Sequence, residues 1–106
     1  MRPIHLARLD KLRPVVVLTR EAARPVMSSV TVAPITSTIR GLSTEVNVGT
    51  VNGLDRESVV SCDNLTTIPA TLLGERIGIL LEHQERDLAR AIVLSFDLDL
   101  PLLSGS

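Results

Sequence analysis

The chain has 106 residues, of which 11 are Lys or Arg and 12 are Asp or Glu, so its formal net charge is −1. This length supports one domain around one core and excludes separate substrate and cofactor domains. We therefore expect a single domain over residues 1–100 and a tail over 101–106. The single cysteine, Cys62, excludes an intramolecular disulfide, and no apolar run reaches membrane-spanning length, so we expect the reducing cytoplasm and no membrane.

The first half of the chain predicts β-structure. Five short strands are predicted, at residues 4–9, 13–19, 28–35, 43–48 and 58–62. The second is an apolar run rich in β-branched residues, and the fourth alternates polar and apolar residues like a half-exposed strand. The connections between them are read as a compact turn at 10–12, a polar connection at 20–25 and a turn at 49–53. Pro34 lies near the end of the third strand and implies an edge or a bulge, because proline cannot donate to the ladder.

The second half turns helical. Pro69 suits the first position of a single helical turn and Gly74 suits its stop. A short strand is expected at 77–80, and a longer helix begins near Glu82. One face of that helix carries five residues at spacings of three and four: Leu88, Ala91, Ile92, Ser95 and Phe96. The whole pattern predicts a mainly β fold with α (α+β), namely a small, strongly curved barrel with a helix packed on it.

Phe96 is the only aromatic residue in the chain. A small core without large rings buries modest area per residue, so the domain is a candidate for stabilisation by pairing with a second copy. Charge is also uneven: residues 1–40 carry a net charge of +5 and residues 41–106 carry −6. This asymmetry is consistent with a face that binds a polyanion and equally with ordinary solvation of a surface.

Several kinds of site are disfavoured by the sequence. The carboxylates are scattered, and His5 and His83 are read as surface or strand-edge residues. No Cys and His cluster has the spacing of metal ligands, so we expect no metal and no cofactor. Cys62 lies in an apolar strand, where a buried, inert thiol is expected rather than a nucleophile.

The remaining candidate chemistry is an arginine with a hydroxyl. Arg13 precedes Pro14, which restricts the arginine to an extended backbone at the start of a strand. Thr36 ends the next strand along the chain. RNA carries its own nucleophile, the 2′-hydroxyl, so an enzyme that cleaves it needs mainly to orient the phosphate and stabilise its charge. The alternative is structural: Arg13 would solvate a strand start, and Thr36 would close a turn.

The order of these motifs resembles the MazF/PemK family of toxin endoribonucleases. In that family an Arg-Pro opens an apolar strand and a threonine ends the following strand, as Arg13 and Thr36 do here. The runs at 58–64, 66–68 and 73–78 resemble later segments of the family in the same order. The resemblance implies that Arg13 and Thr36 are catalytic.

For the whole molecule, the resemblance implies an SH3-like barrel of the CcdB/PemK kind and a homodimer. It implies sequence-specific, metal-independent cleavage of single-stranded RNA to a cyclic phosphate and a 5′-hydroxyl. It also implies a MazE-like antitoxin that neutralises the toxin. Two other functions stay open: a CcdB-like toxin that binds a topoisomerase without cutting RNA, and a catalytically inactive module that binds an antitoxin.

The chain departs from the family pattern in two ways. It lacks the aromatic residues that are usual in the first strand, and the turn at 10–12 replaces a long connection before Arg-Pro. Base stacking on aromatic side chains, a common way to hold single strands, is therefore unavailable. Five residues near the predicted pair are expected to contact RNA: Arg8, Lys11, Ser37, Thr38 and Arg40.

Overall fold

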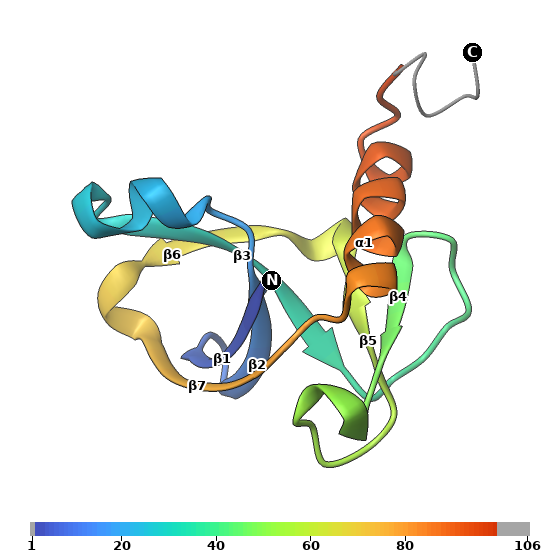
Figure 1. Ribbon diagram of the computed structural model, residues 1–106, viewed down its shortest axis with the longest axis horizontal. Helices are drawn as coiled ribbons and strands as arrows, with labels where there is room; N and C mark the ends of the chain where they lie inside the picture. The colour runs from blue at the N-terminus through green and yellow to red at the C-terminus, as the bar shows by residue number, and fades with distance from the viewer. Residues whose placement is uncertain (1, 100–106) are drawn as a thin grey trace.

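The computed structural model describes residues 2–99, which form an antiparallel β-sheet and one α-helix (Figure 1). The strands are β1 Pro3–Arg8, β2 Leu12–Val17, β3 Ser29–Thr36, β4 Glu45–Val48, β5 Ser58–Ser61, β6 Thr66–Pro69 and β7 Leu73–Ile79. The helix, α1, spans Glu82–Ser95. The predicted tail at 101–106 lies outside the described residues.

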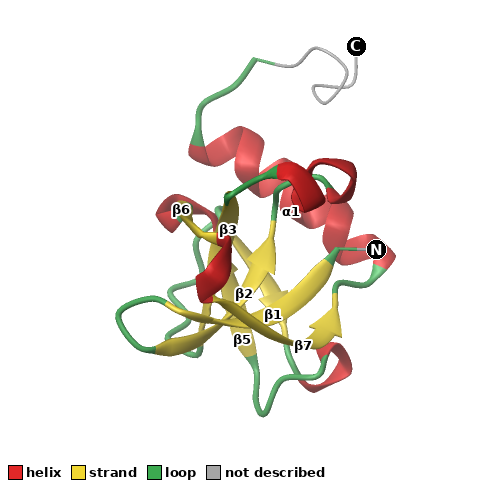
Figure 2. Cartoon of the chain, turned by 90° about the vertical axis from the view of Figure 1, so that its left-hand side faces the viewer, coloured by secondary structure: helices red, strands yellow, loops and turns green. Residues whose placement is uncertain are grey.

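The strands pair in the order β4-β5-β3-β2-β1-β7, and β6 pairs with β3 off this path. Within residues 2–99 the order ends at β4 and at β7, so these ladders do not close into a ring. The mainly β architecture with a C-terminal helix is confirmed (Figure 2). The barrel is not, because β6 and β7 follow one another through a 3₁₀ turn, η4 (Ala70–Leu72), without a ladder between them.

Strand β3 is paired along one edge by β6 and β5 in turn. Val32 lies opposite Thr66 on β6, whereas Ile35 lies opposite Val60 on β5. The extra length on the partner side is taken up by a 3₁₀ turn, η3 (Cys62–Asn64). Pro34 pairs with Val15 on the other edge of β3, but neither the β5 ladder nor the β6 ladder contains a partner for it. The bulge predicted from Pro34 therefore fits the structure, and the edge alternative does not.

The central strand β2 is buried on both faces of the sheet. Val15 and Val17 belong to one apolar cluster, and Val16 belongs to the other, which also contains Leu88 and Ala91 of α1. Because neighbouring residues of a strand point to opposite faces, the uninterrupted apolar run of β2 requires two covered faces. This arrangement holds β2, and with it Arg13 at its start, in a rigid position.

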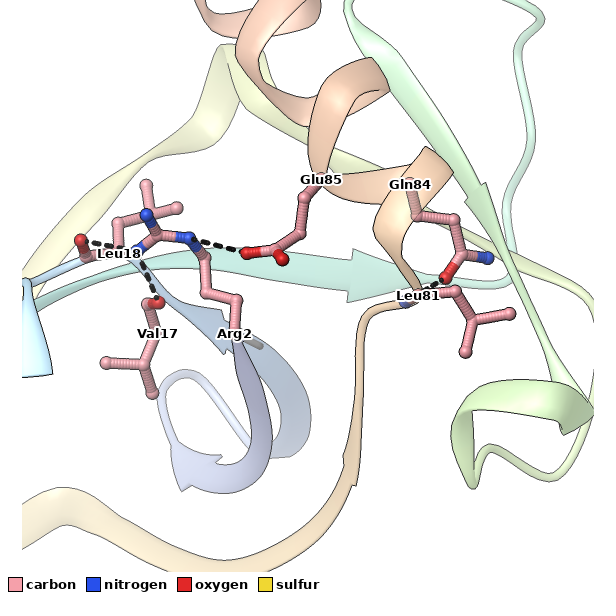
Figure 3. Close-up of polar contacts among 6 residues, drawn as sticks. All are labelled: Arg2, Val17, Leu18, Leu81, Gln84 and Glu85. Carbon is pink, nitrogen blue, oxygen red and sulfur yellow. Dashed lines mark hydrogen bonds and ion pairs between the residues drawn. The ribbon is translucent and has the colours of Figure 1, made fainter.

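Helix α1 begins at Glu82, as predicted. The Gln84 side-chain oxygen accepts a hydrogen bond from the backbone N–H of Leu81, the N-cap residue, at 2.9 Å and so caps the N-terminus of the helix (Figure 3). Phe96, predicted on the same face as Leu88 and Ala91, does not share their burial: it is 56% exposed, whereas Leu88 and Ala91 are buried. The helix ends at Ser95, so Phe96 is its C-cap residue and lies beyond the last helical position.

Three of the predicted connections contain short 3₁₀ turns. η1 (Glu21–Val26) lies in the predicted connection at 20–25, η2 (Thr50–Asn52) lies in the predicted turn at 49–53, and η4 is the single helical turn predicted after Pro69. The strand expected at 77–80 begins earlier, as β7, so that Gly74 lies inside a strand rather than ending a helical turn. The β7 sequence contains two glycines and two charged residues, and its extended form depends on pairing with β1. None of the helices within 2–99 combines the length and apolarity needed to cross a bilayer.

Candidate active site

Arg13 and Thr36 come together on neighbouring antiparallel strands. Val15 of β2 lies opposite Pro34 of β3, and the same register extended by two positions places Arg13 opposite Thr36. Directly opposed residues of an antiparallel pair project from the same face of the sheet. Both side chains line the same two pockets. The sequence therefore predicted a pair that the fold brings into one site.

We name each of the two pockets after a residue that lines it and does not line the other. The Asp63 pocket has a volume of about 670 Å³, and the Lys11 pocket has a volume of about 490 Å³. Arg13, Thr36 and Thr38 line both of them. The catalytic candidates thus stand on the boundary between two adjoining hollows, where a substrate could extend to either side of them.

Arg13 is held by the carboxylate of Asp10, a residue that was predicted only to form part of the turn at 10–12. Its Nε and Nη2 donate to the two carboxylate oxygens of Asp10 at 2.8 and 3.0 Å. The backbone N–H of Leu9 donates to the carbonyl of Lys11 at 3.0 Å, which tightens the turn and turns Asp10 back toward β2. The signal that could have found Asp10 is an acid three residues before the arginine, in the turn between β1 and β2.

This fork-shaped contact fixes the orientation of the Arg13 guanidinium. The hydrogen bonds from Arg13 hold the pKa of Asp10 well below its usual range, and the same contact raises the pKa of Arg13. Within residues 2–99 the third nitrogen of Arg13, Nη1, has no hydrogen-bond partner. It is therefore available to a substrate, while the other two nitrogens position it.

The Thr36 hydroxyl is also oriented. Its oxygen accepts a hydrogen bond from the Thr38 backbone N–H at 3.1 Å. Since a hydroxyl has one hydrogen to donate and two lone pairs, this contact leaves the Thr36 hydrogen free to donate to a phosphate oxygen. The arrangement can supply one fixed cation and one hydroxyl donor to the same ligand.

Glu45 organises the loop that carries several of the predicted contacts. Its carboxylate accepts hydrogen bonds from the backbone N–H groups of Arg40, Gly41 and Leu42, at distances of 2.8 to 3.3 Å. Asp63 similarly accepts from the Thr44 hydroxyl at 2.6 Å. Neither role was visible in the sequence, because each carboxylate meets its loop only after β4 and β5 have paired.

The other predicted contacts distribute around the pair. Lys11 and Ser37 line the Lys11 pocket, and Arg40 lines the Asp63 pocket. Arg8 is exposed at the end of β1 and lines neither pocket. Four basic side chains and four carboxylates line the two pockets together, so their formal charges cancel: Lys11, Arg13, Arg40 and Arg56 against Asp10, Glu45, Asp55 and Asp63.

The remaining titratable candidates lie away from this pair. Cys62 is buried, and desolvation raises the pKa of its thiol to about 11, which suits an inert side chain. The His5 Nδ1 lies 2.9 Å from the Gly74 carbonyl oxygen, across the β1–β7 ladder. In the described part of the chain, no three His, Cys, Asp or Glu side chains gather as metal ligands would.

Comparison with known proteins identifies the family. Residues 5–96 match the PemK-like, MazF-like toxin of type II toxin–antitoxin system. The chain is 64% identical over 99 residues to endoribonuclease MazF3 of Mycobacterium tuberculosis, covering 93% of this chain and 96% of that protein. The solved structure of Mycobacterium tuberculosis toxin MazF-mt6 is 63% identical, with a TM-score of 0.92 over 93% of this chain and 100% of that one.

A more distant structure has the same fold. An endoribonuclease from a mycobacterial species, solved in complex with its cognate antitoxin, is 21% identical with a TM-score of 0.83. It covers 93% of this chain and 95% of that one. Taken with the family match, these likenesses show that the chain belongs to the PemK-like, MazF-like family of type II toxin–antitoxin toxins.

Proposed function

We propose that this protein is a toxin that cleaves single-stranded RNA at specific short sequences, without a metal ion, and that a cognate antitoxin neutralises it. The observation that carries the proposal is the meeting of Arg13 and Thr36 on the wall shared by two pockets. Further support comes from the relative that is 64% identical and is named an endoribonuclease.

In the proposed reaction, the 2′-hydroxyl oxygen of the substrate attacks the adjacent phosphorus. The bond from phosphorus to the 5′-oxygen breaks, and the proton lost by the 2′-hydroxyl is balanced by one gained at the leaving 5′-oxygen. The products are a 2′,3′-cyclic phosphate and a 5′-hydroxyl. The nucleophile belongs to the substrate, so the protein has to orient the groups and stabilise developing charge.

Arg13 and Thr36 have distinct parts in this step. The free Nη1 of Arg13 donates to a non-bridging phosphate oxygen, where negative charge increases as the 2′-oxygen attacks. Thr36 donates its hydroxyl hydrogen to the same phosphate and holds it in line. Because Asp10 and Thr38 already orient these two side chains, little reorganisation is needed when the substrate binds.

The residues around the pair hold the flanking nucleotides. Lys11, Ser37, Thr38 and Arg40 contact the RNA within the two pockets, through phosphate contacts and hydrogen bonds to bases. Arg8 contacts it outside them, from the exposed end of β1. In the absence of stacking aromatics, sequence preference rests on hydrogen bonds and on the planar faces of arginines.

The same proposal includes the antitoxin partner, the oligomeric state and the cellular location of the toxin. The structure solved with a cognate antitoxin belongs to a protein of this fold, and we propose that this chain has an antitoxin of its own. The exposed apolar side chains at the end of α1, Leu94, Phe96 and Leu98, are consistent with a homodimer, and we place the protein in the cytoplasm.

The test is cleavage of RNA by pure protein in EDTA. Wild type is expected to cut, and Arg13→Ala is expected to reduce the rate by about 10²–10³-fold, as the loss of one charge-stabilising donor does. Thr36→Val, which keeps the shape and removes the hydroxyl, should also reduce the rate. Thr71→Val, at an exposed position on η4, is the matched control and should cut like wild type.

Circular dichroism of each variant establishes that the fold is retained. If wild type arrests growth on expression but cuts no RNA, the catalytic proposal fails in favour of a toxin that only binds its target. If neither growth arrest nor cleavage occurs, the protein is an inactive antitoxin-binding module.

A further inference from the structure

A third pocket lies near the other end of β2, away from Arg13. It has a volume of about 490 Å³ and lies between the starts of β1 and η1, with β7 and α1 contributing to its walls. We name it the β1–η1 pocket. Four of its lining residues are arginines: Arg2, Arg20, Arg24 and Arg76. None of these was predicted as a site residue.

Arg2 lines this pocket, and its side chain is held by contacts with β2 and α1 (Figure 3). Its Nη1 donates to the carbonyl of Leu18 at 2.8 Å and to that of Val17 at 3.3 Å. Its Nε lies 3.9 Å from a carboxylate oxygen of Glu85 on α1. Arg2 therefore has a structural role, tying β1 to the end of β2 and to the helix.

The other three arginines differ from Arg2. Within residues 2–99, Arg20, Arg24 and Arg76 have no carboxylate oxygen within 4.0 Å and no hydrogen bond from their side chains. They come from the start of η1, from its last turn and from β7. No internal contact explains why two segments distant in sequence, η1 and β7, both contribute arginines to the lining of one hollow.

The charge of this pocket contrasts with that of the candidate active site. Its four arginines are opposed by two carboxylates, Glu21 and Glu85, which leaves a formal charge of +2 with His5 neutral. The Asp63 and Lys11 pockets together carry no net charge. Since affinity for a nucleic-acid backbone comes mainly from basic side chains that neutralise phosphates, the active site alone is a weak source of affinity.

The position of the β1–η1 pocket suits the same ligand. Val17 lines it, whereas Arg13 lies four residues earlier on the same strand. At the rise of a β-strand these two positions are about 13 Å apart. An RNA strand that continues past the scissile phosphate needs only a few more nucleotides to cover that distance.

We propose that the β1–η1 pocket binds backbone phosphates of the substrate RNA outside the cleaved sequence, through Arg20, Arg24 and Arg76. The inference rests on the proposed function and extends it: the substrate is an RNA longer than the stretch that is cut. Guanidinium forks match phosphate oxygens in pairs, and contacts with the backbone carry no sequence preference. Recognition of the sequence thus stays at the active site, while the β1–η1 pocket supplies affinity.

The test compares two double variants that change charge equally. Arg20→Gln/Arg76→Gln removes two free guanidiniums from the pocket. Arg86→Gln/Arg90→Gln, on the exposed face of α1, is the matched control. The probe is a mixed-sequence RNA of about 16 nucleotides, a length typical of single-strand sites, with 2′-O-methyl groups so that it cannot be cut.

Binding is measured over a series of salt concentrations. Each phosphate contact in a single strand contributes about 0.7 to the slope of log affinity against log salt. The pocket variant should therefore lose about 1.4 from this slope, while the control keeps the wild-type slope. In cleavage assays the pocket variant should raise KM on a long RNA and leave kcat unchanged, and a short RNA that spans only the cut sequence should be cleaved as by wild type.

Equal slopes for the two double variants would overturn the proposal. So would a pocket variant that binds RNA normally but loses affinity for a polyglutamate peptide, because the pocket would then recognise an acidic peptide. Cleavage of the short RNA in EDTA, and its loss in Arg13→Ala, are measured on the same preparations. Failure of the β1–η1 pocket is thus separable from failure of the nuclease itself.

Discussion

The contact between Asp10 and Arg13 leads to a prediction for the cleavage rate, and its direction is not obvious. Asp10 could hinder catalysis by competing with the substrate phosphate for Arg13, or it could help by holding the guanidinium in place. The geometry favours the second effect, because Asp10 takes Nε and Nη2 and leaves Nη1 free within the described residues. Asp10→Asn separates the two effects, since the amide is nearly isosteric and uncharged.

The expected changes in kcat and KM have opposite consequences for activity. A guanidinium that is no longer held by two charged hydrogen bonds moves off line, and a displacement of 1 Å can reduce a rate by about 100-fold, so we expect kcat to fall by about tenfold or more. A bound phosphate would lie about 6 Å from the carboxylate, where removal of the like charge strengthens binding in water by about threefold. KM should therefore fall slightly, and more at low salt than at high salt.

The assay is steady-state cleavage of a short fluorescent RNA in EDTA, with Asp55→Asn as the control. Asp55 also lines the Lys11 pocket but makes no ion pair with Arg13, so its variant shares the change in charge without the change in geometry. Asp55→Asn should keep the wild-type kcat. If Asp10→Asn cuts as fast as wild type or faster, Asp10 does not position Arg13 and the reasoning is wrong.

The low pKa of Asp10 adds an expectation about pH. A carboxylate whose pKa is depressed on folding supplies its interaction above the ordinary value and loses it only as pH falls through the lower, folded value. The Asp10–Arg13 contact should therefore survive at a pH near 4, where an unpaired aspartate is half protonated. A wild-type rate that falls in proportion to ordinary aspartate protonation would contradict this.

Three further predictions concern stability and reactivity. Gly78→Ala should lower the free energy of unfolding by about 3 kcal/mol, because the added Cβ would overlap the Asn52 carbonyl oxygen; Gly41→Ala, in open space at φ 75°, should lower it by only about 1 kcal/mol, and equal effects in urea denaturation would refute the packing argument. Gln84→Ala should lower it by about 2 kcal/mol, because the buried amide of Asn52 donates to Gln84 at 2.5 Å; a neutral result in the same assay would show that water replaces this contact. Cys62, with its pKa raised to about 11 by burial, should react with iodoacetamide only after denaturation at a pH near 8; rapid labelling of the folded protein would place the thiol at the surface.

The sequence by itself determined the elements whose signal is local. The apolar, β-branched run of β2 and the proline after Arg13 predict an extended backbone with Arg13 near its start, and the structure contains this strand. The start of α1 at Glu82 also followed from composition and periodicity. Arg13 and Thr36 could be singled out because each stands at the end of a predictable strand.

Tertiary structure decided what depends on contacts between distant segments. The strand β7, with its glycines and charges, is extended because it pairs with β1. The change of partner along β3, from β6 to β5, places the polar residues around η3 in the wall of the Asp63 pocket. The free arginines of the β1–η1 pocket come from η1 and β7, and nothing in the local sequence relates one to the other. The physical reason is common to these cases: a propensity acts over a few residues, whereas pairing register and charge convergence are set only when the whole sheet has assembled.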